Sequence, residues 1–439
     1  MKKYIYLIGS FMVLSVFAQA QQNDATLPDS ATVGDCVEYA LKHYPGLQAS
    51  YVNEAITNSQ IKTKIADWYP QIAANATGQH YFQVPQTIIG GAVTPAAVTN
   101  SAGVDFGLSQ NIFNRDALLA SQTRNNVLQV AKQNTELTKI DVIVNVRKAF
   151  YDVLLTKEQI KVLQEDIIRL QKSLHDARSQ YEAEIVDNTD YKRATISLNS
   201  STAQQRAAQQ LLVAKYATLK QLMGYPMNEP LNLHAADSID LEQQAMFDTT
   251  TVANPQNRVE LQQLQTQQIL NQANLRYEKW SYIPSISAVA GYNLAYMNNT
   301  NFWKMFNNNY PNSYVGIQLG VPIFQGFKRT ENIRIAKFQI DLNKLNQSDL
   351  NNSINAEYQN ALAIYKGDLV NYETLKANVE LAKQVYNTIA LQYQASYKSY
   401  LDVTNAETDL RTAEINYANA LYQLIVDKVD VEKSLGLIQ

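Results

Sequence analysis

The chain has 439 residues, with 37 Lys and Arg against 40 Asp and Glu, and its formal net charge is -3. This balance argues against a nucleic-acid-binding protein, which would carry an excess of basic side chains. A single cysteine and four scattered histidines exclude a disulfide framework and a CxxC site, and they argue against a His-based zinc site.

The first twenty residues have the pattern of a cleaved signal peptide. Lys2 and Lys3 precede an apolar stretch over 5–17, and residues 18–20 (AQA) form a small-x-small cleavage pattern. A transmembrane anchor is the alternative, but the stretch is shorter than the about 20 apolar residues of a membrane helix. No cysteine stands at the cleavage point, so lipidation is not indicated, and Cys36 is predicted to be a small buried residue. We therefore expect an exported chain that can cross a membrane only with strands.

A helix comes first in the mature chain, over roughly 33–67, and proline at position 70 ends it because proline lacks the N–H that a helix needs. Alternating apolar and polar residues then predict strands near 71–83 and 102–112. In the second strand, Val104, Phe106 and Leu108 share one face, and small or polar residues occupy the other. Such a polar face suits a water-filled lumen better than a packed core.

A helix of about 70 residues follows, from near 114 to 184, which corresponds to roughly 100 Å. Its apolar residues repeat every seven positions, which is typical of a coiled-coil seam. The repeating positions are Val153, Ile160, Ile167, Leu174 and Tyr181. After a short turn, a return helix of about 35 residues ends at Gly224, and residues 225–253 form a connector.

The chain then repeats itself. Residues 181–224 align without a gap on residues 393–436, an offset of 212, and the heptad pattern recurs at the same offset. The second half therefore predicts a helix over 255–280, strands near 284–295 and 313–323, a long helix from 328 to 396, and a return helix ending at Gly436. We divide the chain into a signal peptide (1–20), a first repeat (21–224), the connector and a second repeat (254–439).

Four strands of this length fit a membrane, but they cannot close a barrel, because the smallest outer-membrane barrels have about eight strands. Several chains must therefore pool their strands; three would give twelve and two would give eight. The links over 84–101 and 296–312 are interpreted as outside loops with an aromatic girdle. The alternative is a soluble loop with buried aromatic residues. The aromatic residues are Tyr296, Phe302, Trp303, Phe306 and Tyr310.

This order of elements, written twice behind a signal peptide, resembles the TolC-like outer-membrane efflux proteins. Residues 40–45 (ALKHYP) are similar to the family's opening helix, and residues 320–326 (GVPIFQG) are similar to its strand-to-helix junction. The stretch 393–436 resembles the family's last helical hairpin. The resemblance implies an α-helical barrel joined to a transmembrane β-barrel, in a homotrimer with twelve strands embedded in outer-membrane lipid. It also implies a passive duct without a cofactor, fed by an inner-membrane RND or ABC pump through a periplasmic adaptor.

The resemblance places the periplasmic mouth at the hairpin turns, near 184–190 and 396–402. Asp402 matches a position where relatives often carry an acidic constriction, and Asn405 stands where some carry a second acid. Helix capping is the alternative role for Asp402, because Asp190 occupies the same place in the first repeat and aspartate is a favoured N-cap.

The resemblance further suggests contacts that tie neighbouring hairpins together when the mouth is closed. The expected pairs are Tyr393 with Asp190 and Lys398 with Thr189, although Tyr393 also lies on the heptad seam. Relatives often have glycine in the turns, where this chain has Glu184 and Ser396, so the turn geometry is expected to differ. The candidates for adaptor docking at the tip are Glu184, Asp187, Ser396 and Tyr397.

Two other classes of protein remain as rivals. An enzyme is disfavoured, since the sequence has no Walker loop, GxGxxG or GxSxG pattern. A pore-less exported coiled-coil scaffold would explain the heptads but not four barrel-length strands placed symmetrically in the repeat. The cargo stays open among drugs, metal ions, bile salts and polypeptides.

Overall fold

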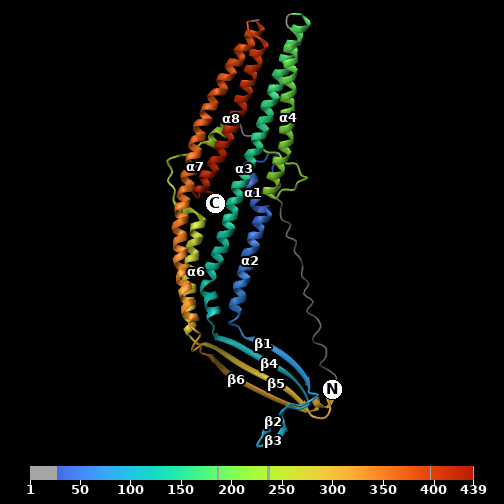
Figure 1. Cartoon of the computed structure of the whole chain (residues 1–439), viewed down its shortest axis with the longest axis vertical. Helices are drawn as coiled ribbons and strands as arrows, with labels where there is room; N and C mark the ends of the chain where they lie inside the picture. The colour runs from blue at the N-terminus through green and yellow to red at the C-terminus, as the bar shows by residue number, and fades with distance from the viewer. Residues whose placement is uncertain (1–26, 185–186, 235–237, 396, 439) are drawn as a thin grey trace.

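The computed structural model describes residues 27–184, 187–234, 238–395 and 397–438. The signal-peptide segment and Ser396 lie outside this range. The molecule is elongated: a four-stranded sheet stands at one end, and long helices rise from it (Figure 1). None of the helices in the described segments is long and apolar enough to span a membrane.

The opening helix is broken, which corrects the prediction of one helix over 33–67. α1 (Val33–His43) and α2 (Pro45–Ala66) meet at Tyr44, whose ψ of 119° is extended. The cause is Pro45, because a proline ring disfavours the helical region for the residue before it. In the second repeat the same position is held by a 3-10 turn, η1 (Pro255–Asn257), followed by α6 (Val259–Lys279).

The sheet contains β1 (Gln71–His80), β4 (Asn100–Phe113), β5 (Ser285–Asn298) and β6 (Asn309–Gly320), in the order β1-β4-β5-β6. All neighbours are antiparallel, and the central β4–β5 pair joins the two repeats. The last strand lies about three residues earlier than the predicted 313–323. Pro322 accounts for the earlier end of the strand, because it has no N–H to donate to the ladder.

The predicted loop over 84–101 contains two short strands, β2 (Gln86–Ile89) and β3 (Ala92–Pro95), which extend past the main sheet (Figure 1). Gly90 and Gly91 turn the chain between them with φ of 59° and 86°, angles that glycine adopts without steric cost. In the other loop, η3 (Trp303–Asn307) carries exposed aromatic rings, with Trp303 77% exposed. The alternative, in which these aromatic residues are buried, is therefore wrong for Phe302, Trp303, Phe306 and Tyr310, whereas Tyr296 is half-buried against Phe306.

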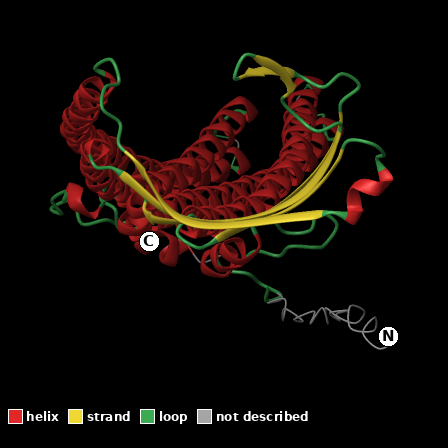
Figure 2. Ribbon diagram, turned by 90° about the horizontal axis from the view of Figure 1, so that it is seen from below, coloured by secondary structure: helices red, strands yellow, loops and turns green. Residues whose placement is uncertain are grey.

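Two long helical hairpins make up the rest of the molecule. α3 (Arg115–Glu182) turns back into α4 (Asn188–Met223), and α7 (Lys328–Gln394) turns back into α8 (Tyr400–Ser434). Seen along the long axis, the helices and the sheet follow the same arc (Figure 2). A single chain is thus a curved wall with an open concave side.

The main core lies at mid-height, where the predicted connector packs against both hairpins. The connector contains a helix, α5 (Ser238–Ala245), and its Leu231 and Leu233 are buried. The Tyr365 hydroxyl donates to the Ala245 carbonyl at 2.9 Å and accepts from the Phe247 N–H at 2.9 Å. The prediction for Cys36 is confirmed: it is fully buried, and burial raises the pKa of its thiol to about 12.

Candidate functional site at the hairpin tips

The two hairpins end at the same end of the molecule, far from the sheet (Figure 1). In the first hairpin, Glu184 adopts φ of 57° immediately after α3. Its N–H donates to the Tyr181 carbonyl at 3.0 Å, so the helix end closes in a left-handed turn. Glu184 thus takes the left-handed conformation that glycine favours, and the expected difference from relatives with glycine at this turn stays a prediction.

The return helices begin at residues other than the predicted caps. Asp187 caps α4, accepting from the Thr189 N–H at 2.6 Å, and Ser399 caps α8. Asp402 stands three residues after the N-cap Ser399. Its carboxylate accepts hydrogen bonds from the Ser399 N–H at 3.0 Å and from the Ser399 hydroxyl at 2.8 Å. Asp402 is therefore half of a capping box and not the N-cap itself.

Hydrogen bonds and burial move the pKa values of these acids in opposite directions. The bonds from Ser399 lower the pKa of Asp402, and those from Thr189 lower the pKa of Asp187. Asp190 has the same place in its helix as Asp402, but burial and then the neighbouring Asp187 raise its pKa. The two repeats thus present unlike acids at equivalent positions.

The predicted hydrogen bonds of Tyr393 with Asp190 and of Lys398 with Thr189 do not form within one chain. The Tyr393 hydroxyl donates to Gln180 Oε1 at 2.9 Å and not to Asp190. Burial raises the pKa of Tyr393, and the charge of Asp190 adds to this effect. Across the described part of the chain, no hydrogen bond links Lys398 to Thr189.

The expected docking positions are on the surface where they are described. Glu184 and Asp187 are exposed, Tyr397 is 84% exposed, and Asn405 is also exposed. Ser396, the remaining candidate, falls outside the described residues.

Contacts that the sequence patterns did not predict join the two hairpins near the tips. Ala177 of α3, Ala194 of α4 and Tyr400 of α8 form a small buried cluster, with Tyr393 packed against it. The Tyr393 and Tyr400 rings lie edge to face, 6.0 Å apart. The sequence held a signal for this contact. The alignment of 181–224 with 393–436 matches Asp190 to Asp402, and Tyr400 stands two residues before Asp402.

Further from the tips, a buried ionic group connects the hairpins. We call it the inter-hairpin cluster; it consists of Asp166, Arg169, Ser201, Glu407, Arg411 and Glu414. Arg411 Nη1 contacts Ser201 Oγ at 2.7 Å and Asp166 Oδ2 at 3.2 Å. Ser201 donates to Asp166 at 2.7 Å, and Arg169 pairs with Glu414 at 3.1 Å.

Glu407 is the unpaired member of the inter-hairpin cluster. Its side chain is almost fully buried, and neither carboxylate oxygen has a hydrogen-bond partner. Burial, followed by the charge of Asp166, raises the pKa of Glu407 to about 7. The sequence held a signal for the burial of this residue, because Glu407 and Glu414 stand seven residues apart beside the apolar seam of α8.

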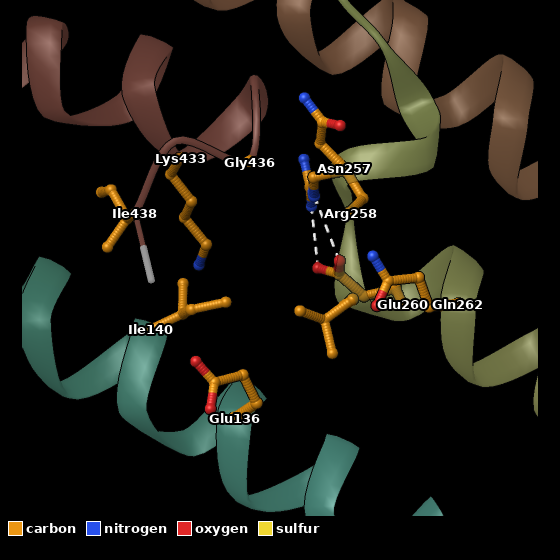
Figure 3. Close-up of a pocket in the computed structure, with 10 residues that line it drawn as sticks. Glu136, Ile140, Asn257, Arg258, Glu260, Gln262, Lys433, Gly436 and Ile438 are labelled. Carbon is orange, nitrogen blue, oxygen red and sulfur yellow. Dashed lines mark hydrogen bonds and ion pairs between the residues drawn. The ribbon is translucent and has the colours of Figure 1, made fainter. Parts of the chain in front are cut away.

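A cavity of about 170 Å³ lies where α6 begins and α8 ends, beside α3 (Figure 3). Arg258 stands on its wall and bonds Glu260 at 2.8 Å, Glu357 at 3.1 Å and the Ser434 carbonyl at 3.2 Å. This volume is below the range of typical small-molecule sites. Because the carboxylates already hold the arginine, the arrangement serves as a structural junction.

In the described parts of the chain, no three His, Cys, Asp or Glu side chains are placed to hold a metal ion.

Comparison with known proteins places the chain among efflux proteins. The sequence matches the family described as "Outer membrane efflux protein" over residues 36–225 and 254–437. It is similar to the outer membrane protein TolC of Vibrio cholerae, with 21% identity over 353 residues that cover 77% of each chain. It is also similar to the outer membrane efflux protein BepC of Brucella suis, with 19% identity over 405 residues, or 90% of this chain and 83% of BepC.

Solved structures share the fold along nearly the whole chain. CusC superposes with a TM-score of 0.75 and 17% identity, covering 92% of this chain and 91% of CusC. The open state of the MtrE outer membrane channel of Neisseria gonorrhoeae gives a TM-score of 0.69 and 18% identity, covering 92% of this chain and 88% of MtrE.

Proposed function

This chain belongs to the outer membrane efflux protein family, and from that premise we propose that three copies form a single duct through the outer membrane and into the periplasm. The chain is an outer-membrane efflux channel. The curved sheet is the observation that supports a trimer, because its edge strands β1 and β6 have no partner on their outer sides (Figure 2). Open edges are not tolerated in lipid, and three copies close twelve strands with cyclic symmetry.

The exposed apolar face of the sheet supports its position in the membrane. Val315 is 85% exposed, Ile317 75% and Leu319 60%, and they alternate along β6. The register pairs Val315 with Ala290 and Ala290 with Leu108, so the apolar residues of neighbouring strands share this face. Contact with lipid would remove this surface from water.

An apolar stripe on α7 supports contact between subunits in the periplasmic part. Ile335, Phe338, Leu342 and Leu345 follow one face of the helix at spacings of three and four residues, and each is more than half exposed. Exposed stripes of this kind are typical of protein interfaces.

The duct is passive in this proposal. An inner-membrane pump of the RND or ABC type supplies the energy, and a periplasmic adaptor docks at the tip around Glu184, Asp187, Ser396 and Tyr397. Between neighbouring chains, Tyr393 with Asp190 and Lys398 with Thr189 hold the mouth closed until the adaptor separates them. Asp402, repeated three times around the axis, attracts cations to the mouth while it also completes the capping box of α8 with Ser399.

Site-specific crosslinking tests this proposal. Cys36 is replaced by Ala, a cysteine is placed at position 396 or, as a second site, at the exposed Tyr397, and a thiol-reactive crosslinker is added to intact cells. We expect an adaptor or pump component among the trapped proteins, identified by mass spectrometry. A matched cysteine at the exposed Lys337, distant from the tip, should trap neither.

Trapping only copies of this chain, with normal membrane insertion, would contradict docking at the tip. The pore-less scaffold makes a different prediction, since it would be extracted from membranes by carbonate as a monomer. A channel of the proposed kind resists extraction and runs as a heat-sensitive oligomer on a gel.

A further inference from the structure

One charged residue stands in the membrane part of the sheet. Among the residues of β1, β4, β5 and β6, all of which the structure describes, Asp105 is the only Asp, Glu, Lys or Arg. An ionisable side chain in a membrane-spanning segment is costly, and where one is found it generally serves a function. Asp105 lies five residues from the outer end of β4, roughly 17 Å along the strand and close to its middle.

The register places one polar side chain on each strand beside Asp105. Asn75 of β1 pairs with Asp105, Asp105 pairs with Asn293 of β5, and Asn293 pairs with Asn312 of β6. The Asn293 amide nitrogen donates a hydrogen bond to Asp105 Oδ1. The four side chains form a continuous row of amide and carboxylate groups across the sheet.

This row is on the face opposite the apolar one. Side chains alternate along a strand, so Asp105 points away from the side that carries Phe106 and Val104. Asn312 likewise faces away from the side of Val315. Because the apolar face is the one that lipid can cover, the polar row faces the interior of a closed barrel.

We propose that Asp105 is a specificity-determining residue, whose three copies form an acidic ring inside the β-barrel that favours cationic over anionic solutes. This inference rests on the proposed trimer, because only the three-fold axis brings the three carboxylates to one level. The asparagine rows run obliquely between them, since barrel strands tilt, and they extend the polar wall.

The size of the effect follows from the width of the barrel. Twelve strands about 4.8 Å apart and tilted by about 40° give a backbone diameter of about 24 Å, which leaves the carboxylates about 10 Å from the axis. The Debye length is about 10 Å at 0.1 M salt and about 3 Å at 1 M. Three such charges change the ratio of cation to anion permeability by about fivefold at 0.1 M and by almost nothing at 1 M.

The test is the reversal potential of the purified channel in a planar bilayer under a KCl gradient, with Asp105→Asn compared with the unaltered protein. We expect the K⁺/Cl⁻ permeability ratio to fall by about fivefold near 0.1 M and to stay unchanged near 1 M. Asn75→Asp, which adds an acid to the adjacent strand in the same row, should raise the ratio. Asp402→Asn serves as the comparison for acids at the periplasmic mouth.

An equal K⁺/Cl⁻ permeability ratio in Asp105→Asn and in the unaltered protein would overturn the inference. The proposed function as a duct would still stand. A loss of selectivity in Asp402→Asn alone would also overturn it. Failure of the unaltered protein to form any channel is a different result, because it contradicts the proposed function itself.

Discussion

Glu407 lies between the two hairpins at 2% exposure, without a hydrogen bond to either carboxylate oxygen. The arginines of the inter-hairpin cluster are engaged elsewhere, Arg411 by Asp166 and Ser201 and Arg169 by Glu414. Desolvation therefore disfavours the ionised form of Glu407, and its pKa rises from about 4.5 to about 7. The folded chain holds this proton more tightly than the unfolded chain does.

We expect Glu407→Gln to stabilise the protein at pH 8 and to have little effect at pH 4.5. A raised pKa in the folded state contributes stability below the unfolded pKa, and this contribution is lost as the pH rises through about 7. The neutral amide avoids that loss, by up to about 3 kcal/mol in the free energy of unfolding. Denaturant unfolding at both pH values measures the difference.

Asp409→Asn is the matched control, since it removes an acid from the same part of α8 at an exposed position. Its effect should be small at both pH values. If Glu407→Gln changed the stability equally at pH 4.5 and pH 8, the buried carboxyl would not be the titrating group.

At the scale of single residues, the sequence predicted the tip only in part. The capping role of the tip acids was anticipated, but it was assigned three residues too late in both hairpins. Ser399-Tyr400-Leu401-Asp402 is itself an S-x-x-D pattern, so this error was avoidable. The bond from Tyr393 to Gln180 was not predictable, because it depends on the tertiary contact between α7 and α3.

At the scale of elements, the turn after α3 contains a local conflict. Glu184 adopts a left-handed conformation at φ of 57°, which costs an L-residue about 1 kcal/mol. Glutamate at this position therefore suits a surface role better than a stable turn, which agrees with its proposed contact with an adaptor.

We expect Glu184→Gly to raise the free energy of unfolding by a few tenths to about 1 kcal/mol, because glycine adopts positive φ without strain. Thermal unfolding is the measurement. Glu182→Gly, at the last residue of α3, should instead destabilise the hairpin by a few tenths of a kcal/mol, because it removes the helical ion pair with Arg178. Equal effects at the two positions would show that the backbone conformation of Glu184 is irrelevant.

The long, periodic elements were the ones that the sequence predicted well. Heptads and alternation identified the two hairpins and the four strands, because these patterns extend over many residues. The short elements β2, β3 and α5 were missed. Their sequences have no long period, and α5 is held by tertiary contacts around Tyr365 that the sequence does not display.

At the scale of the whole molecule, the curved wall of one chain leaves large apolar surfaces uncovered. We expect Phe338→Asp, in the exposed stripe of α7, to abolish the heat-sensitive oligomer on a gel, because it places a charge in the proposed subunit contact. Lys337→Asp, at the adjacent exposed position off the stripe, should leave the oligomer intact. Loss of the oligomer in both variants, or in neither, would place the contact elsewhere.

The pairing of β4 with β5 also constrains the order in which the chain can fold. Asn100 lies opposite Asn298, so nearly half of the sequence separates the two strands at the centre of the sheet. The α3–α4 hairpin needs only local contacts and can form while later residues are still being exported. The complete sheet cannot form until the second repeat supplies β5 and β6. Bringing β4 and β5 together is slow, because a long stretch of chain separates them. During that interval β1 and β4 present unpaired edges in an aqueous compartment, and a holding chaperone would have its greatest effect there.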